Sequence, residues 1–369
     1  MNQLFRWDQM GLFLLALAAG ILPFAVPEVC AAALREGLAL CSGPLLLSLF
    51  PFLVVSRLLI QCPESDLLAL PFRLAAWGIG IRTPCAARVL CIGFLGGFAP
   101  AASAAAQAVR TGQLTAEEAD ALLPACICSG PSFVVLTVGQ SLLGSAELGV
   151  LLFASQITAN YLTAALLNRF AGVRSVKPGS ATPASPAPPR LDEILADAAI
   201  TYCKLCGFIL FFRMLAAGAG ALLPAGAGTL CAILLEVCSG CDLASRTGRW
   251  GSLLCCAALS VQGLSVLLQV RTICPPEMTL RPLYWARMLH LPLSLALFYL
   301  LLPGGEADVF STLPARVLLM RRVPPDCALL VFAVCCMAAC TLRSGIRQVE
   351  QKQMARNAGG CCINSKTLL

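Results

Sequence analysis

The sequence predicts an all-α, polytopic transmembrane protein with two related halves, and three observations support this fold class. Of the 369 residues, 58% are apolar and only 12% are charged, about half the charged fraction of roughly 25% that a soluble domain carries. Long uncharged runs recur along the chain, and a proline-rich segment divides it. This composition excludes a soluble enzyme, a disordered protein and most nucleic-acid binders. The expected partner is therefore the lipid bilayer, with no nucleic acid, and the net charge of +7 reflects basic cytoplasmic loops.

The predicted spans are uncharged runs of 16 to 26 residues, because a helix needs about 20 apolar residues to cross a bilayer. A tenth candidate, 194–213, contains Lys204. The first run is interpreted as a retained helix, because no clean signal-peptide cleavage site follows it. The nine uncharged runs are 9–27, 37–56, 89–109, 121–146, 148–168, 214–235, 250–270, 288–305 and 327–342.

Residues 171–190 are rich in proline and contain basic but no acidic side chains, which predicts an extended cytoplasmic linker. It separates an N-terminal membrane half (1–170) from a C-terminal half (191–345), and a basic tail (346–369) is expected on the same side. Five spans after the linker would put the tail on the other side. Either one run in the second half turns back within the membrane, or one charge signal is misleading.

Two runs are expected to contain interrupted helices. The run 89–109 includes Gly97 and Pro100, and the run 214–235 includes Pro224 among several glycines. Glycine and proline at this density predict non-helical backbone at membrane depth, in 96–100 and in 222–228. The alternative is close packing of continuous helices on small residues.

A short motif recurs once on each side of the linker. Gly130-Pro131-Ser132 and Gly263-Leu264-Ser265 share the pattern Gly-x-Ser, and each follows a glycine- and proline-rich run. Pseudo-symmetric halves with interrupted helices are typical of secondary transporters. The expected hinge positions are Gly97, Pro100, Gly130, Pro131, Pro224, Gly240 and Gly263.

Residues 91–170 and 205–290 resemble the two halves of the nucleoside-recognition, or gate, family, and within it the YlbJ-type sporulation integral membrane proteins of endospore-forming bacteria. The chain departs from the family pattern at Cys126-Ile127-Cys128, where asparagines are common, and at Ala102, where glycine is common. The segments that carry the resemblance are Gly97–Pro100, Leu114–Glu118, Ser129–Phe133, Gly207–Phe212, Leu235–Gly240, Gln262–Gln269 and Tyr284–Arg287.

The resemblance implies a multi-pass protein of the bacterial plasma membrane, in the mother cell or the forespore, that is required for spore formation. It also implies a conduit or transporter for a small solute or a nucleoside-like ligand. The alternative is a membrane scaffold of the sporulation programme that transports nothing.

The candidate substrate-binding residues are uncharged polar groups and one acid. Such polar groups can bind a solute or can hydrogen-bond one helix to another. Glu236 ends a long apolar run, and a broken helix would bring it to mid-membrane, where its protonated form would donate to the Gln262 carbonyl. The alternative is that Glu236 lies at the membrane interface. The candidates are Ser129, Ser132, Gln140, Glu236, Ser239, Gln262, Ser265 and Gln269.

The sequence predicts no enzyme, cofactor or metal site. His290 is the single histidine, so no Ser/His/Asp triad and no multi-histidine metal site is expected. No Walker loop is present. Two Cys-x-x-Cys pairs, 203/206 and 238/241, lie in or beside apolar runs without the charged surroundings of a zinc ribbon.

Overall fold

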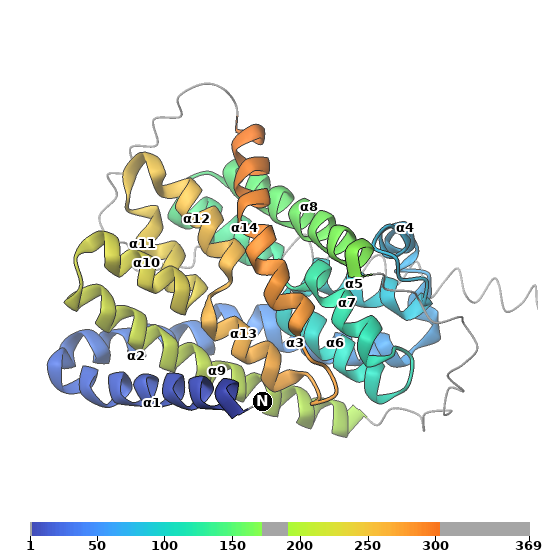
Figure 1. Ribbon diagram of the computed structural model, residues 1–369, viewed down its shortest axis with the longest axis horizontal. Coiled ribbons are helices and arrows are strands. Elements are labelled where there is room, and N and C mark those ends of the chain that lie inside the picture. The colour runs from blue at the N-terminus through green and yellow to red at the C-terminus, as the bar shows by residue number, and fades with distance from the viewer. Residues whose placement is uncertain (1, 172–190, 303–369) are drawn as a thin grey trace, which may run out of the picture.

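The computed structural model describes residues 2–171 and 191–302, and every regular element in these ranges is a helix (Figure 1). The all-α membrane class is therefore confirmed, whereas 172–190, 327–342 and the tail 346–369 lie outside the described ranges. The first half comprises α1 (Asn2–Ala25), α2 (Pro27–Ser42), α3 (Pro44–Gln61), η1 (Pro63–Asp66), α4 (Leu70–Gly78), α5 (Pro84–Gly96), α6 (Phe98–Arg110), α7 (Ala116–Cys126), the π-helix η2 (Ser132–Leu142) and α8 (Ala146–Ala171). The second comprises α9 (Leu191–Leu222), α10 (Ala225–Leu235), α11 (Val237–Ser245), η3 (Gly248–Trp250), α12 (Gly251–Val261), α13 (Gly263–Ile273) and α14 (Arg281–Leu301).

Four helical segments of the described chain are long and apolar enough to cross a membrane. Large apolar side chains are exposed along the helices, with Phe24 88%, Phe170 81% and Leu300 77% exposed. In a bilayer such side chains face lipid, and the helices satisfy their own backbone hydrogen bonds. The four segments are Pro27–Leu47, Ala146–Ala171, Leu191–Leu222 and Gly248–Ile273.

The predicted interruption in the run 89–109 is a hairpin, and of the residues 96–100 that were predicted to be non-helical only Gly97 lies outside the helices. Helices α5 and α6 have 13 residues each, so each is about 20 Å long at 1.5 Å per residue and too short to cross a core of about 30 Å. The chain reverses at Gly97, whose φ of +80° lies in the left-handed region. Pro100 lies inside the first turn of α6, where its missing N–H has no intrahelical partner to lose.

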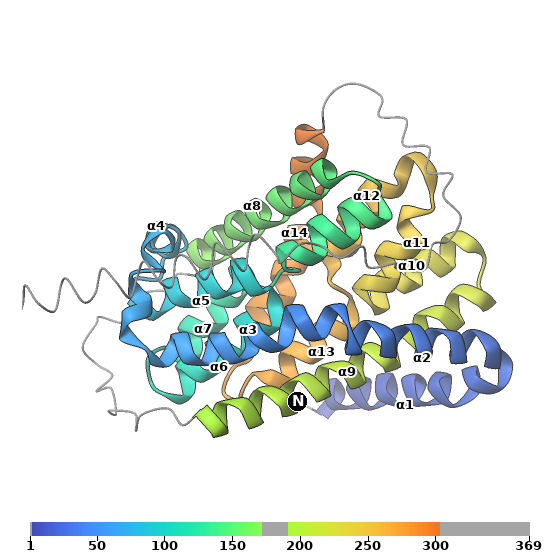
Figure 2. The ribbon, with the colours of Figure 1, turned by 180° about the vertical axis from the view of Figure 1, so that it is seen from behind.

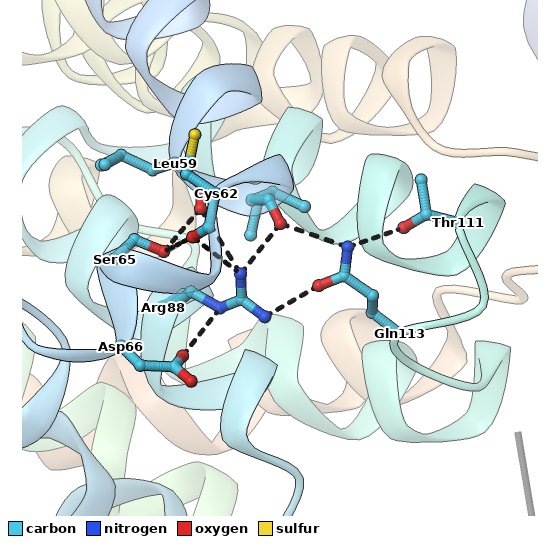
Figure 3. Close-up of polar contacts among 8 residues, drawn as sticks. Leu59, Cys62, Ser65, Asp66, Arg88, Thr111 and Gln113 are labelled. Atoms are coloured by element: carbon cyan, nitrogen blue, oxygen red, sulfur yellow. Dashed lines mark hydrogen bonds and ion pairs between the residues drawn. The ribbon is translucent and has the colours of Figure 1, made fainter. Parts of the chain in front are cut away.

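Arg88 joins the open end of this hairpin to the end of α3 (Figure 3). Its guanidinium donates to the carbonyl of Ile60 (2.9 Å) and to Oε1 of Gln113 (2.8 Å), just beyond α6. Its Nε forms an ion pair with Asp66 at 3.1 Å. The carbonyls that end α3 thus receive a cation, as helix C-termini favour.

Helices α10 and α11 form a second hairpin, which enters the fold from the end opposite to that of α5–α6. Arg57 of α3 forms an ion pair with Asp197 of α9 at 2.5 Å, so α3 ends where α9 begins. We call this the linker end. The far end of the 32-residue α9 lies beside the open end of the α10–α11 hairpin, where Gly220 approaches Gly228 and Leu243. Figure 1 shows α5 and α7 near one end of the ribbon and α10 and α11 near the other.

The tip of this second hairpin is Glu236, not the predicted segment 222–228. Only Leu223 and Pro224 interrupt the helices there, and they form an exposed turn between α9 and α10. Gly240 lies inside α11, where a Cβ would lie 2.8 Å from Cα of Ile233. Within the run 214–235, a Cβ on Gly218 would lie 2.7 Å from Leu22, and a Cβ on Gly228 would lie 3.1 Å from Cα of Gly220. These glycines serve close helix packing, which was the alternative interpretation.

Two broken helices complete the halves. The pair α7–η2 starts at the linker end and is interrupted at residues 127–130, whereas α12–α13 runs the opposite way and is interrupted at Gln262. Each is followed by a long antiparallel helix, α8 and α14 respectively. The elements α3, α5–α6, α7–η2 and α8 thus have inverted counterparts in α9, α10–α11, α12–α13 and α14. Figure 2 shows α3 continuing from α2 beside α9.

The α10–α11 hairpin bears on the question of parity. It returns to the end from which it entered, so the described part of the second half contains a run that turns back, which is the first of the two alternatives. The side on which the tail lies also depends on 327–342, which is outside the described residues.

Candidate functional site

The four interruptions converge at the centre of the fold. A Cβ on Gly97 would lie 2.7 Å from the amide nitrogen of Gly130, so the tip of the first hairpin touches the break in α7–η2. A Cβ on Gly263 would lie 2.9 Å from the amide nitrogen of Glu236, so the second hairpin touches the break in α12–α13 in the same way. Only glycine permits these backbone approaches. We call this region the crossing.

Ser129 and Gln262 connect the two halves at the crossing. Each precedes the glycine of its Gly-x-Ser motif, so the two are equivalent positions of the repeat. Gln262 Nε2 donates to Ser129 Oγ at 3.3 Å and to the Leu259 carbonyl at 2.6 Å. Gln262 Oε1 is buried without a hydrogen-bond partner in the described residues. The crossing therefore offers an acceptor that the protein itself does not use.

Glu236 is buried at the crossing, with 2% exposed, and lies next to the Gln262–Gly263 break as expected. Its role differs from the expected one. Its two carboxylate oxygens accept the amides of Cys238 (2.8 Å) and Ser239 (2.7 Å) and so cap α11. An acceptor at a helix N-terminus is stabilised by the unpaired amides and the helix dipole. The cap takes the place of the expected bond to Gln262.

Arg287 of α14 hydrogen-bonds to both broken helices close to their interruptions. Its guanidinium donates to the carbonyls of Ile127 (2.8 Å) and Ser260 (3.3 Å), at the ends of α7 and α12, and to Asn160 Oδ1 (3.2 Å). Arg287 is only 7% exposed and has no ion pair among the described residues. Two helix C-termini instead supply the negative potential. The sequence signal for this role was the segment Tyr284–Arg287, but its partners were not visible.

Other polar residues join helices. Gln156 Nε2 donates to Ser260 Oγ at 3.0 Å and to the Cys256 carbonyl at 3.2 Å. The backbone carbonyl of Gln156 contacts His290 Nε2 at 3.2 Å. Ser260 also bonds to Ser294. These contacts fasten α8, α12 and α14 together, as hydrogen bonds between membrane helices do.

The remaining predicted site residues divide into three groups. Ser265 and Gln269 are buried on α13, and Gln269 Nε2 donates to Ser265 Oγ at 2.9 Å. Ser132 opens η2 next to Pro131, and Ser239 is in the first turn of α11. Gln140 is exposed near the far end of η2, away from the breaks. In the described residues no cluster of His, Cys, Asp or Glu has metal-binding geometry.

A pair of variants at Glu236 separates capping from proton coupling. Glu236→Ala removes the cap, worth about 0.5–2 kcal/mol, and leaves two buried amides without an acceptor, whereas Glu236→Gln keeps one acceptor oxygen. We expect the melting temperature of the detergent-purified protein to decrease from wild type to Gln to Ala, and solute flux to follow the same order. Glu147→Ala, at an exposed acid in the first turn of α8, is the matched control and should change little. Loss of flux in the Gln variant at unchanged melting temperature would instead indicate proton coupling.

Comparisons with known proteins identify no relative. No family model, no curated protein and no solved structure matches the chain.

Proposed function

We propose that this protein is a membrane conduit for a small polar solute, which binds at the crossing and passes between the two ends of the molecule. The observation that carries the proposal is the inverted pair of halves, each with a hairpin tip against a broken helix, joined through Ser129 and Gln262. Inverted repeats with discontinuous helices around a central site are the architecture of many secondary transporters.

The chemistry of the crossing supports a polar solute. Gln262 Oε1 has no partner among the described residues, and no side chain caps the first turns of α6 and α13. Free amides at half-helix N-termini attract acceptor groups. A solute with both donors and acceptors, such as a nucleoside-like ligand, fits this set.

Flux into proteoliposomes tests the proposal. The full chain is reconstituted, and uptake of radiolabelled uridine and inorganic phosphate is compared with uptake by empty liposomes. We expect uptake above background, and at least about a tenfold decrease in Gln262→Leu, since about 1.4 kcal/mol of lost interaction is tenfold. Gln140→Leu makes the same change at the exposed end of η2 and should leave uptake intact. Uptake equal to that of empty liposomes would favour the scaffold.

The role in spore formation rests on the family resemblance. In a host that sporulates, we expect deletion of the gene to lower the yield of heat-resistant spores while vegetative growth stays normal. Complementation with the Gln262→Leu variant then distinguishes the two functions, because a scaffold should be restored by it and a conduit should not. A growth defect with normal spore yield would indicate a housekeeping transporter.

A further inference from the structure

A polar pocket lies at the linker end between α3, α6, α9 and α13. Its volume is about 160 Å³, well above the roughly 10–15 Å³ that a single water needs. Helix α6 is the outgoing arm of the first hairpin, and α13 is the second part of a broken helix. The pocket is therefore bounded by α6 of the first hairpin, by α13 of the second broken helix and by the related helices α3 and α9.

The walls of the pocket carry an excess of positive charge. Arg57, Arg110 and Lys204 line it with one carboxylate, Asp197, so two positive charges are uncompensated. Arg57 is 8% exposed and forms the ion pair with Asp197. Arg110 and Lys204 are exposed at the rim and have no ion pair among the described residues. Cations that converge on a concave surface concentrate anions there.

The pocket also holds an unused acceptor. Gln269, which is 2% exposed, lines it, and its Oε1 is buried with no hydrogen-bond partner in the described residues. Buried polar atoms are nearly always paired, so an orphan beside a cavity indicates a missing donor. A ligand with an anionic group and a hydroxyl or acid proton satisfies both the cations and this oxygen.

A polar face of α13 connects the pocket to the crossing. Gln262, Ser265 and Gln269 follow the spacing of one helix face, and each is at most 2% exposed. Gln269 Nε2 already donates to Ser265 Oγ at 2.9 Å. The face leads from the pocket to the unpartnered oxygen of Gln262.

We propose that this pocket binds a small anion that carries a phosphate or carboxylate group and at least one proton donor. That the anion is the transported solute rests on the proposed function; that it binds does not. Basic residues at a cytoplasmic end are expected from topology alone. The proposal therefore depends on their convergence with Gln269 on one cavity.

Binding is tested on the full chain in neutral detergent by its melting temperature in sodium phosphate, against sodium chloride of equal ionic strength. A ligand that binds only the folded state raises the melting temperature as it saturates. We expect phosphate to do so in wild type, and the double variant Arg110→Gln/Lys204→Gln to require at least about tenfold more phosphate, since these are charge-assisted contacts. The double variant Arg169→Gln/Arg281→Gln removes the same charge from exposed positions outside the pocket and should match wild type.

Gln269→Glu is the second, isosteric test. A carboxylate in place of the amide should abolish the phosphate effect, and its basal melting temperature shows whether the variant folds. Equal phosphate responses of the pocket and control double variants would overturn the proposal. So would a response to phosphate in Gln269→Glu that is undiminished.

Nanodiscs identify the source of the anion. In phosphatidylcholine nanodiscs the phosphate response should persist, and addition of phosphatidylglycerol should leave it unchanged. A phosphate response that phosphatidylglycerol removes would overturn the assignment to a soluble solute and indicate a lipid headgroup. Binding without flux in proteoliposomes refutes the proposed function alone, whereas uridine flux without phosphate binding refutes the anion site alone.

Discussion

Gly97→Ala is expected to destabilise the protein much more than Gly112→Ala, although both glycines have φ near +70 to +80°. The left-handed conformation costs an alanine about 1–2 kcal/mol at either position. At Gly112 a Cβ meets nothing within 4 Å, whereas at Gly97 it lies 2.7 Å from Gly130 N. Forcing the backbones of the crossing apart adds about 1–3 kcal/mol. Thermal melting of the two detergent-purified variants measures the difference.

The same comparison applies to the second half, because the contact between a hairpin tip and a broken helix is repeated there. Gly263, with φ +70°, would place its Cβ 2.9 Å from Glu236 N, while Gly144, with φ +74°, has nothing within 4 Å. Gly263→Ala should therefore destabilise the protein more than Gly144→Ala, by a margin similar to that between Gly97→Ala and Gly112→Ala. If all four variants have the same melting temperature, the backbone contacts at the crossing do not hold the hairpin tips in place.

Arg287→Leu is expected to give the largest loss of stability among the arginine variants. It removes the donor from the Ile127 and Ser260 carbonyls and from Asn160 Oδ1. A buried acceptor left without its donor costs about 1–3 kcal/mol. We expect a strongly lowered melting temperature and, in membranes, loss of flux. Arg287→Lys keeps the charge but not the planar set of donors, so it should be intermediate.

Arg246→Leu is the control for Arg287. Arg246 is 59% exposed and pairs with Asp242 four residues earlier in the sequence, at 2.8 Å. An exposed pair of this kind contributes about 0.3–0.5 kcal/mol. Similar melting temperatures for Arg246→Leu and Arg287→Leu would contradict the role of Arg287 as the cap of two broken helices.

The positions of the interruptions show how far sequence patterns reach. The break at Gly97 and the Gly-x-Ser repeat were visible in the sequence, because glycine at a tight turn has a local cause that does not depend on distant residues. The tip at Glu236 was missed, since it contains neither glycine nor proline. Its side chain supplies the cap, and Gly263, distant in sequence, makes room for it.

In the segment 214–235 the prediction of non-helical backbone in 222–228 holds only for Leu223 and Pro224, and the alternative, close helix packing, applies to most of its glycines. Gly218 approaches Leu22, and Gly228 of α10 approaches Gly220 of the preceding helix, α9. Glycine has two uses in a membrane protein, at turns and at close helix contacts. A single sequence does not distinguish them, because the difference lies in which neighbour approaches the glycine.

The sequence by itself determined the all-α membrane class and the repeat across the linker, and it offered a run that turns back as one of two alternatives. It could do so because apolar run length and charge are local properties that act directly on insertion into the bilayer. Only the tertiary structure decided which runs are hairpins, that Ser129 meets Gln262, that Arg287 caps two helices, and that three cations and Gln269 share one pocket. Several of these contacts join distant residues: Ser129 and Gln262 are 133 positions apart, and Arg287 and Ile127 are 160 positions apart. Their partners are chosen by helix packing, which no local pattern encodes.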